Sequence, residues 1–514
     1  MKGYIISHDI GTTGNKATLF DISSGTIKDK AFVPYDTFYP YPGWAEQDPE
    51  GWWDAVVKST QILLSRNRDA IRRIEAIGCS GQMMGCLPVD GRGVPLLRSI
   101  IHADIRSLRQ VDLIGSELGR ERIYGITGNV LDPHYPLPKM LWLKENEPDI
   151  YRKARFFLQS KDYITFRMTG VLGYTDPSDA SLTAMWDIRR RDWSDEILSF
   201  LGMGRDMMPT VVPSSHVLGG LRGDVASIMG LPSGIPVVVG GGDGASATIG
   251  AGLVSRGKAY NYIGGTSWIA TLSPEPLLDP EMRVFHFADM QEGWVDVVGT
   301  VQCAGSSYDW FIREMGEKEL KEAESIGTSP YSLMDEVARR SPPGARGLFF
   351  LPYLMGERTP IWDPLARGVF FGLTLAHKKE DLARAVLEGV AYALNSILDV
   401  LQELGGPIES VTVIGGGARG TLWREIMADV YGKRIIVPDN IGEATSYGAA
   451  IAAGVGIGVF DGFQAAERYL RIVAEHIPDE DRSRRYRGFY EFYLSLYPKM
   501  KDLFHSLHVL LSQG

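Results

Sequence analysis

Apolar residues near the start of the chain form two short runs, separated by a turn of small and polar residues. The run Tyr4–Ile10 predicts a buried strand, and the run Lys16–Ile22 predicts a second strand that returns beside it. The segment Ala259–Leu272 repeats this strand–turn–strand pattern about half a chain later. Two hairpins of one type at the starts of two halves predict a duplicated fold that holds a ligand between its copies.

Further apolar periodicities predict alternating strands and helices in both halves. Strands are expected at Ile74–Gly78, Pro236–Val239, Gly347–Leu354 and Val411–Ile414, and helices at Pro49–Ser65, Lys161–Met168, Lys379–Leu401, Thr421–Tyr431 and Glu443–Ala453. This alternation predicts an α/β fold. We divide the chain into domains 1–254 and 255–514. From about residue 478 a charged, aromatic and helical tail is expected to be peripheral.

Composition limits the classes of function. Of 514 residues, 44% are hydrophobic and 23% are charged, as in an ordinary globular protein, and the net charge of −10 disfavours non-specific nucleic-acid binding. The three cysteines, Cys79, Cys86 and Cys303, form no C-x-x-C pair, so neither a disulfide framework nor structural zinc is expected.

The expected location follows from the same features. The N-terminus enters a strand without a signal peptide, and the longest apolar tract, 235–254, is broken by Asp243 and many glycines. We therefore expect a cytoplasmic protein with no membrane partner.

The first hairpin has the composition of a phosphate-binding turn. Asp9 ends the first strand, and Thr12, Thr13 and Lys16 add two hydroxyls and an amine to the backbone N–H groups of a glycine-containing turn. Such a turn holds a polyphosphate without a P-loop, and G-x-x-x-x-G-K-[ST] occurs nowhere in the chain. Asp9 stands where it can hold a metal through water. Alone, the pattern is equally typical of an ordinary hairpin.

Asp243 is the candidate catalytic base. It follows the strand Pro236–Val239 in a bed of glycines, Gly240–Gly242, which lets a substrate approach closely. A hydroxyl that attacks phosphorus needs a base within hydrogen-bond reach. The alternative is that Asp243 is the N-cap of the next helix, and both roles are compatible.

Three other groups are candidates, each with a structural alternative. The turn Gly415–Arg419 lets a base or ribose lie on the backbone, or is a plain strand-to-helix turn. Gln82 follows a strand and suits sugar hydroxyls, whereas the neighbouring methionines are more typical of a core. Asp104 and Arg106 are candidates for sugar contact or a surface ion pair, and His102 is interpreted as structural rather than catalytic.

With these residues assembled, the chain resembles the FGGY family of carbohydrate kinases over residues 4–454, with xylulose kinases as the nearest members. The motifs that carry the resemblance are Asp9-Ile10-Gly11-Thr12-Thr13, Ser80-Gly81-Gln82-Met83, Lys161-Asp162-Tyr163, Gly241-Gly242-Asp243, Gly264-Gly265-Thr266-Ser267, Leu351-Pro352-Tyr353 with Gly356–Pro360, Ala366–Leu373, and Gly415–Ala418 with Leu422-Trp423. Their joint order is more specific than any one of them.

The resemblance implies a fold and a set of roles. Two ribonuclease-H-like domains of the actin and Hsp70 ATPase type are expected, with an interdomain cleft, sugar mainly on the first domain and ATP mainly on the second. Asp243 becomes the catalytic base, and Asp9 and Asp243 hold Mg²⁺ through water. The implied nucleotide contacts are Thr12, Thr13, Lys16, Gly265, Thr266, Gly305, Asp309, Gly416, Gly417 and Thr421, and the implied sugar contacts are Gln82, Met83, Met84, Asp104, Arg106 and Asp243.

Departures from the family lie at the sugar end. Met84 stands where xylulose kinases typically carry histidine, and His102-Ala103-Asp104-Ile105-Arg106 replaces their Trp-Asn-Asp-x-Arg stretch. The resemblance implies a transferase that uses ATP and Mg²⁺ to phosphorylate a ketopentose such as D-xylulose. Ribulose, L-xylulose, gluconate or a tetritol is the alternative substrate, and a non-catalytic nucleotide-dependent sugar sensor is the alternative class. Members of this family are often homodimers, so the resemblance implies a homodimer here as well.

Overall fold

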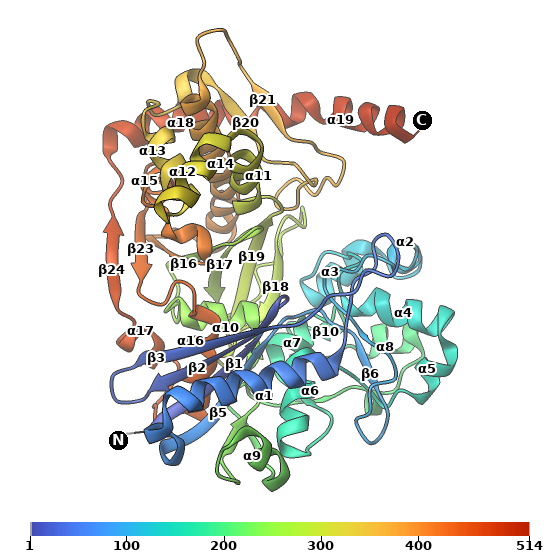
Figure 1. Cartoon of the computed structure of the whole chain (residues 1–514). Coiled ribbons are helices and arrows are strands. Elements are labelled where there is room, and N and C mark those ends of the chain that lie inside the picture. The colour runs from blue at the N-terminus through green and yellow to red at the C-terminus, as the bar shows by residue number, and fades with distance from the viewer. Residues whose placement is uncertain (1–2, 513–514) are drawn as a thin grey trace. The chain divides into compact units, whose positions relative to one another are not determined.

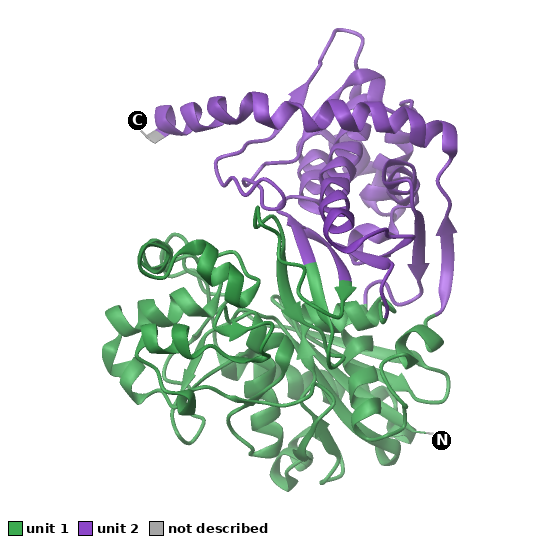
Figure 2. Ribbon diagram, turned by 180° about the vertical axis from the view of Figure 1, so that it is seen from behind, with its two compact units in different colours: residues 1–254, 272–297, 443–470 green, residues 255–271, 298–442, 471–514 purple. Residues whose placement is uncertain are grey.

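The computed structural model describes residues 3–512 of the chain, which folds into two compact units (Figure 2). Unit 1 comprises residues 1–254, 272–297 and 443–470, and unit 2 comprises 255–271, 298–442 and 471–514. The first change from unit 1 to unit 2 falls after residue 254, and beyond it successive segments of the chain alternate between the two units. The sequence-based domains 1–254 and 255–514 therefore stay a prediction about functional halves.

Unit 1 is built on a mixed sheet in the strand order β13-β14-β5-β1-β2-β3 (Figure 1). The antiparallel run β1 (Tyr4–Ile10), β2 (Gly14–Asp21) and β3 (Thr26–Pro34) includes the predicted first hairpin. Next to β1, β5 (Ile74–Gly81) and β14 (Pro236–Val238) run parallel, and β13 (Val217–Gly220) closes the edge.

Helices cover this sheet for identifiable reasons. Helix α1 (Pro49–Arg66) is capped by Asp48 and buries Trp52 and Val56 in the core that includes β1 and β5. Helix α16 (Ala444–Gly456) approaches β5 so closely that a Cβ on Gly78 would lie 2.4 Å from the Ala449 carbonyl oxygen. The Ala/Gly-rich sequence of α16 permits this approach.

Helix α10 (Asp243–Gly250) is fixed by the same close packing. A Cβ on Gly250 would lie 1.8 Å from the Ala444 carbonyl oxygen, and one on Gly448 would lie 2.0 Å from the Ser246 carbonyl oxygen. Glycine on both sides lets the two helices touch backbone to backbone, so the start of α10 has little freedom to shift.

The second sheet repeats the topology of the first. Its order is β18-β19-β17-β16-β22-β23-β24, where β18 is Phe285–Ala288 and β19 is Val295–Val301. The hairpin of β16 (Lys258–Ile263) and β17 (Ser267–Ser273) is the predicted second hairpin, β22 (Ser410–Ile414) and β23 (Arg434–Pro438) run parallel beside β16, and β24 (Ile472–His476) is antiparallel at the edge. The duplicated α/β fold predicted from the two hairpins is confirmed.

A long buried helix organises the helical part of unit 2. Helix α14 (Lys379–Gly405) packs against α11 (Gly305–Met315), α13 (Pro330–Arg339) and α15 (Thr421–Tyr431), and α15 also packs against α18 (Glu480–Leu494). The predicted strand 347–354 is shorter than expected, since only β20 (Phe349–Leu351) pairs, with β21 (Val369–Phe371). The tail ends in α19 (Leu496–Ser512), as predicted helical.

The remaining elements are short. They are β4 (Glu46–Gln47), β6 (Leu87–Val89), β7 (Ser99–Ile100), α2 (Leu108–Glu117), α3 (Arg120–Thr127), α4 (Pro136–Asn146), α5 (Pro148–Lys153), β8 (Phe156–Leu158), α6 (Ser160–Thr169), β9 (Tyr174–Thr175), α7 (Pro177–Ser181), β10 (Trp186–Asp187), β11 (Asp192–Trp193), α8 (Asp195–Leu201), β12 (Thr210–Val211), α9 (Gly223–Met229), β15 (Gly241–Gly242), β18 (Phe285–Ala288), β19 (Val295–Val301), α12 (Glu317–Ile326), α17 (Ala465–Tyr469), and the 3₁₀ turns Arg68–Arg73, Arg205–Met207, Ala345–Gly347 and Gly416–Arg419. Among residues 3–512, no helix combines the length and apolarity needed to cross a membrane.

Candidate active site

Two aspartates of unit 1 lie at the ends of neighbouring strands. Asp9 is the penultimate residue of β1, and Asp243 follows β15 directly as the first residue of α10. Both strands pair with β5, and both Asp9 and Gly241 stand opposite Ser80 in the register. The carboxyl ends of adjacent parallel strands are the usual place for ligands in α/β sheets. The topology thus brings the two predicted carboxylates to one edge.

The surroundings of Asp243 suit a general base. Its side chain keeps some exposure, but the loss of water around it, followed by the negative charge of Asp9, raises the pKa of Asp243 to about 7. One carboxylate oxygen accepts the Gly244 N–H at 2.8 Å, which fixes the orientation of the group. The alternative prediction that Asp243 is the helix N-cap is wrong, because Gly242 occupies that position and Asp243 is already helical.

Asp9 is held by groups from two other segments. Thr445 Oγ1 donates to its carboxylate at 2.6 Å, and Lys16 attracts it, while burial raises the pKa of Asp9 above its usual value. Tyr35 donates to the Gly11 carbonyl, and burial together with the charges of Asp9 and Asp243 raises the pKa of Tyr35 well above its usual value. The tyrosine therefore stays a protonated donor beside the two carboxylates.

The donor set fits a hard divalent cation. Two carboxylates that repel each other are stabilised by Mg²⁺, which prefers oxygen ligands and keeps several waters. Within residues 3–512 there is no group of three or more His, Cys, Asp or Glu side chains arranged as a metal cage. If Mg²⁺ binds here, Asp9 and Asp243 would hold it together with water and phosphate oxygens, and this role stays a prediction.

The Asp243 pKa gives a pH prediction. A base must be ionised to accept a proton, so kcat/KM should fall by about tenfold per pH unit below about pH 7. Because the Asp9 charge contributes to raising this pKa, Asp9→Asn should move the acidic limb to lower pH. Coupled ADP-release assays from pH 5 to 9 measure both profiles. A limb that stays in place or rises in Asp9→Asn contradicts the assigned interaction.

Gln82, a predicted sugar contact, is linked through Gln47 to the predicted phosphate turn at Thr12. Its Nε2 donates to Gln47 Oε1 at 2.6 Å, and Gln47 Nε2 in turn donates to the Thr12 carbonyl at 2.7 Å. Gln82 Oε1 is buried and has no hydrogen-bond partner within residues 3–512. An acceptor without a donor suits a substrate hydroxyl. Sequence reasoning missed Gln47, for which only its place just before the helix start Asp48–Pro49 is a signal.

Asp104 and Arg106 form a buried ion pair, so their interpretation as a surface pair is wrong. The Arg106 side chain is 3% exposed and donates to Asp104 at 2.7 Å and to Glu46 at 2.8 Å. Its guanidinium also lies 3.6 Å from the Trp44 ring centroid. The donors of Arg106 are thus largely committed within the protein, and its predicted role in sugar contact stays a prediction.

The methionine pair divides into two environments. Met83 is buried and packs against Gly242, where a Cβ would lie 2.5 Å from the Met83 sulfur. Met83 therefore packs against the segment that precedes Asp243. Met84 has a φ of 61°, and its carbonyl accepts Lys139 Nζ at 2.9 Å. Lys139 also donates to the Ile101 and His134 carbonyls, and burial lowers the pKa of this lysine to about 7. No sequence signal marked Lys139 as part of this region.

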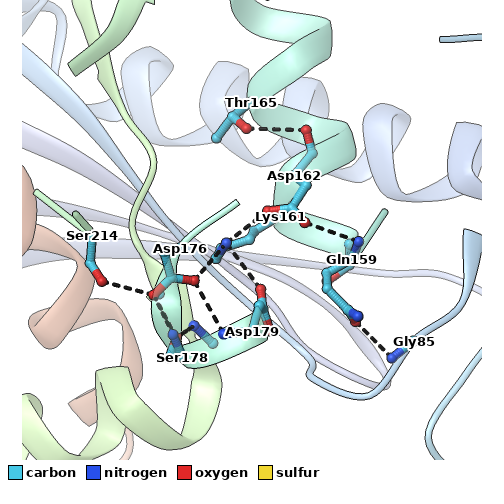
Figure 3. A network of polar contacts seen from close by, with 12 residues as sticks. Gly85, Gln159, Lys161, Asp162, Thr165, Asp176, Ser178, Asp179 and Ser214 are labelled. Atoms are coloured by element: carbon cyan, nitrogen blue, oxygen red, sulfur yellow. Dashed lines mark hydrogen bonds and ion pairs between the residues drawn. The ribbon is translucent and has the colours of Figure 1, made fainter. Parts of the chain in front are cut away.

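A buried ionic cluster supports the Asp243 loop (Figure 3). Lys161 Nζ lies 2.8 Å from Asp162, 2.9 Å from Asp176 and 3.0 Å from Asp179. Ser178 Oγ donates to Asp176 at 2.6 Å and accepts the Gly242 N–H at 2.9 Å. Lys161 thus helps to fix the position of Asp243 through Asp176 and through Ser178 of α7, which binds the preceding Gly242.

In unit 2 the predicted phosphate turn lies against the start of α11. Gly265 and Thr266 are exposed at the tip of the β16–β17 hairpin. The Gly265 carbonyl accepts the N–H groups of Ala304 and Ser306, and a Cβ on Gly305 would lie 2.3 Å from the Gly264 carbonyl oxygen. Two predicted nucleotide positions are therefore adjacent, at a helix N-terminus that favours anions.

The other predicted nucleotide residues lie on the glycine turn before α15, at the start of α15 and on α11. A Cβ on Gly417 would lie 2.3 Å from the Ile263 side chain at the end of β16, so the glycine turn with Gly416 borders the β16–β17 hairpin. Thr421 is exposed as the first residue of α15. Asp309 is exposed on α11 and accepts the Tyr331 hydroxyl at 2.8 Å, so its nucleotide role stays a prediction.

Comparison with known proteins gives consistent results for the whole chain. Residues 4–250 match the N-terminal domain of the FGGY family of carbohydrate kinases, and residues 259–457 match its C-terminal domain. A gluconokinase of Bacillus subtilis (strain 168) is 33% identical over 497 residues, covering 96% of each chain. A xylulose kinase of Escherichia coli (strain K12) is 34% identical over 499 residues, covering 97% of this chain and 99% of that one.

A solved structure confirms the fold class. The ligand-bound xylulose kinase from Lactobacillus acidophilus superposes with a TM-score of 0.90 at 26% identity, covering 98% of this chain and 100% of that one. Two sheets of this topology, each with a strand–turn–strand hairpin, are the fold of the two-domain ATPases related to actin and Hsp70. Within that class the chain belongs to the FGGY family of carbohydrate kinases. It is a kinase that phosphorylates a carbohydrate, and its family uses ATP as the phosphate donor.

Proposed function

We propose that this kinase transfers the γ-phosphoryl group of MgATP to a hydroxyl of a ketopentose, with D-xylulose as the first candidate and xylulose 5-phosphate as its product. The observation that carries the proposal is the placement of Asp243. It heads α10 after three glycines, with its carboxylate oriented by the Gly244 N–H and Asp9 at the same sheet edge.

Asp243 acts as general base in this proposal. Its carboxylate accepts the proton of the sugar hydroxyl as the oxygen forms a bond to the γ-phosphorus, and the bond from phosphorus to the β-phosphate oxygen breaks to release ADP. The proton then passes from Asp243 to solvent. Mg²⁺, held by Asp9 and Asp243 through water, would neutralise charge on the phosphates.

The remaining predicted residues position the nucleotide. Thr12, Thr13 and Lys16 are assigned to phosphate oxygens, as are Gly265, Thr266 and Gly305. Gly416, Gly417 and Thr421 are assigned to adenosine, with Asp309 as a further contact. Phosphoryl transfer depends mainly on such alignment and on charge stabilisation.

Two features bear on the choice of sugar. A neutral ketose fits the free acceptor of Gln82, while the carboxylate of gluconate would seek a cation, and Arg106 already donates to Asp104 and Glu46. The gluconokinase relative supports gluconate as the second candidate. Ribulose, L-xylulose and a tetritol stay open because Met84 cannot supply the hydrogen bond that a histidine would.

A substrate panel tests this choice. ADP release from MgATP is measured with D-xylulose, D-ribulose, L-xylulose, erythritol and D-gluconate, and the phosphorylated product is identified by mass. We expect the highest kcat/KM with D-xylulose. Turnover confined to D-gluconate would make gluconate the substrate in place of D-xylulose. ADP release without any phosphorylated product would mean that none of the five compounds is the phosphoryl acceptor.

The cellular setting is part of the proposal. A role in xylulose metabolism, a cytoplasmic location and a homodimeric state accord with the chemistry and with the acidic, cysteine-poor composition. A non-catalytic sensor would have no need of a base, so the presence of Asp243 favours the enzyme.

A further inference from the structure

One carboxylate of unit 2 lies against the glycine turn that is assigned to adenosine. Asp335 belongs to α13, and a Cβ on Gly420 would lie 3.2 Å from its Oδ2 atom. Gly420 ends the turn and is the N-cap residue of α15. The Asp335 side chain is half-buried, and sequence reasoning did not single it out.

The carboxylate of Asp335 is oriented by a tyrosine. Tyr308, on α11 and 3% exposed, donates its hydroxyl proton to Asp335 Oδ1 at 2.8 Å. The ring of Tyr308 packs on Trp423 of α15, with the centroids 6.0 Å apart, and the Trp423 indole donates to the Leu387 carbonyl at 3.1 Å. One oxygen of Asp335 is therefore committed to a buried hydroxyl, and the other is turned toward Gly420.

The second oxygen of Asp335 is an acceptor that a ligand can reach. Oδ2 accepts no hydrogen bond within residues 3–512, and it is not one of the fully buried polar atoms without a partner. Arg339, one turn further along α13, is paired with Glu425 at 2.8 Å instead. Loss of water raises the pKa of Asp335 to about 6, so above that pH the group is ionised and can only accept.

The turn gives a bound nucleotide a direction. At its start, a Cβ on Gly417 would lie 2.3 Å from the Ile263 side chain, and Ile263 leads into the hairpin tip assigned to the phosphates. At its other end, Gly420 borders Asp335. Phosphates held at the hairpin therefore leave the base for the end of the turn where Asp335 lies. The opposite orientation would bring the phosphates to a carboxylate, which repels them.

We propose that Asp335 selects adenine, because its Oδ2 accepts a hydrogen bond from the exocyclic 6-amino group of the base. Adenine carries a donor at this position, whereas hypoxanthine and guanine carry a carbonyl oxygen. Two acceptors that face each other share no proton, so a 6-oxopurine would leave the carboxylate unpaired, and a site of this kind discriminates strongly. The inference rests on the proposed nucleotide site and adds the choice of base to it.

Calorimetry with the intact chain, in the presence of Mg²⁺ and without sugar, tests the proposal. ADP is compared with inosine diphosphate (IDP), which has a 6-oxo group in place of the 6-amino group. We expect ADP to bind about 10- to 100-fold more tightly than IDP, the range of a hydrogen bond to a charged group. In Asp335→Ala this ratio should fall to within about threefold. A general loss of structure would weaken both nucleotides alike and leave the ratio unchanged.

Glu336→Ala is the matched control. It removes the same charge from the next residue of α13, whose side chain is exposed, and it should keep the ratio of the wild type. A titration with 2′-deoxy-ADP separates the base from the ribose, since the discrimination against this nucleotide should be equal in Asp335→Ala and the wild type.

Three results would overturn the choice of base by Asp335. They are equal binding of ADP and IDP by the wild type, a wild-type ratio in Asp335→Ala, and a loss of discrimination against 2′-deoxy-ADP alone in that variant, which would assign the carboxylate to the ribose. Failure of the wild type to bind ADP at all is a different result. It would remove the proposed nucleotide site, and this inference with it, whatever the sugar is.

Discussion

Asp243→Asn should lose phosphoryl transfer to sugar by about 10²- to 10⁴-fold in kcat while it retains MgATP binding. Asparagine keeps the shape of the side chain and can still accept the Gly244 N–H, but it cannot take up the hydroxyl proton. Steady-state kinetics with mass identification of the product measure the loss, and calorimetry with ATP analogues measures nucleotide affinity. The split between the two readouts separates a lost base from a lost site.

A change in fold would not account for this result. Because the pKa of Asp243 is raised to about 7 from 3.8, its ionised form costs stability as the pH rises through that range, and Asn removes this cost. Asp243→Asn should therefore melt no lower than the wild type at pH 8. Asp224→Asn, in the first turn of exposed helix α9, is the matched control and should keep full activity. Near-normal transfer in Asp243→Asn would end the assignment of this base.

Local sequence patterns predicted the parts of the site that one segment builds alone. The β16–β17 hairpin and helix α15 follow the predicted ranges closely, because turn glycines and apolar periodicity mark their ends. The Asp243 loop was predictable for the same reason, since a strand, three glycines and an acid are contiguous. Only the capping role differed, by one residue.

Contacts between distant segments could not be predicted in this way. Arg106 is buried against Glu46 and Trp44, which lie about sixty residues earlier in the chain. No residue close to Arg106 in the sequence indicates these two partners. Thr445 reaches Asp9 across most of the chain length. Periodicity reports which face of an element is covered but not by which element, so such pairs follow from topology alone.

Lys161→Met should destabilise unit 1 by about 3–5 kcal/mol, the cost of removing one partner from a buried ionic group. The ammonium is fully buried among Asp162, Asp176 and Asp179, and these carboxyls would then lack their counter-charge (Figure 3). Urea unfolding followed by tryptophan fluorescence measures the change. Lys58→Met, which breaks an exposed pair with Asp54, should stay within about 0.5 kcal/mol of the wild type.

Asp179→Asn tests which charges the lysine balances. Burial raises the pKa of Asp179 well above its usual value and repulsion from Asp162 and Asp176 adds to this, while the Lys161 ammonium opposes both effects. Asparagine removes the charge of one of the three carboxyls around Lys161 but keeps the shape of the side chain, and we expect a cost below about 1 kcal/mol. If Asp179→Asn is instead as damaging as Lys161→Met, all three carboxyls carry charge and the lysine holds them together alone. If Lys161→Met itself unfolds like the wild type, the carboxyls replace the ammonium by taking up protons, and Gly242 keeps its Ser178 contact without it.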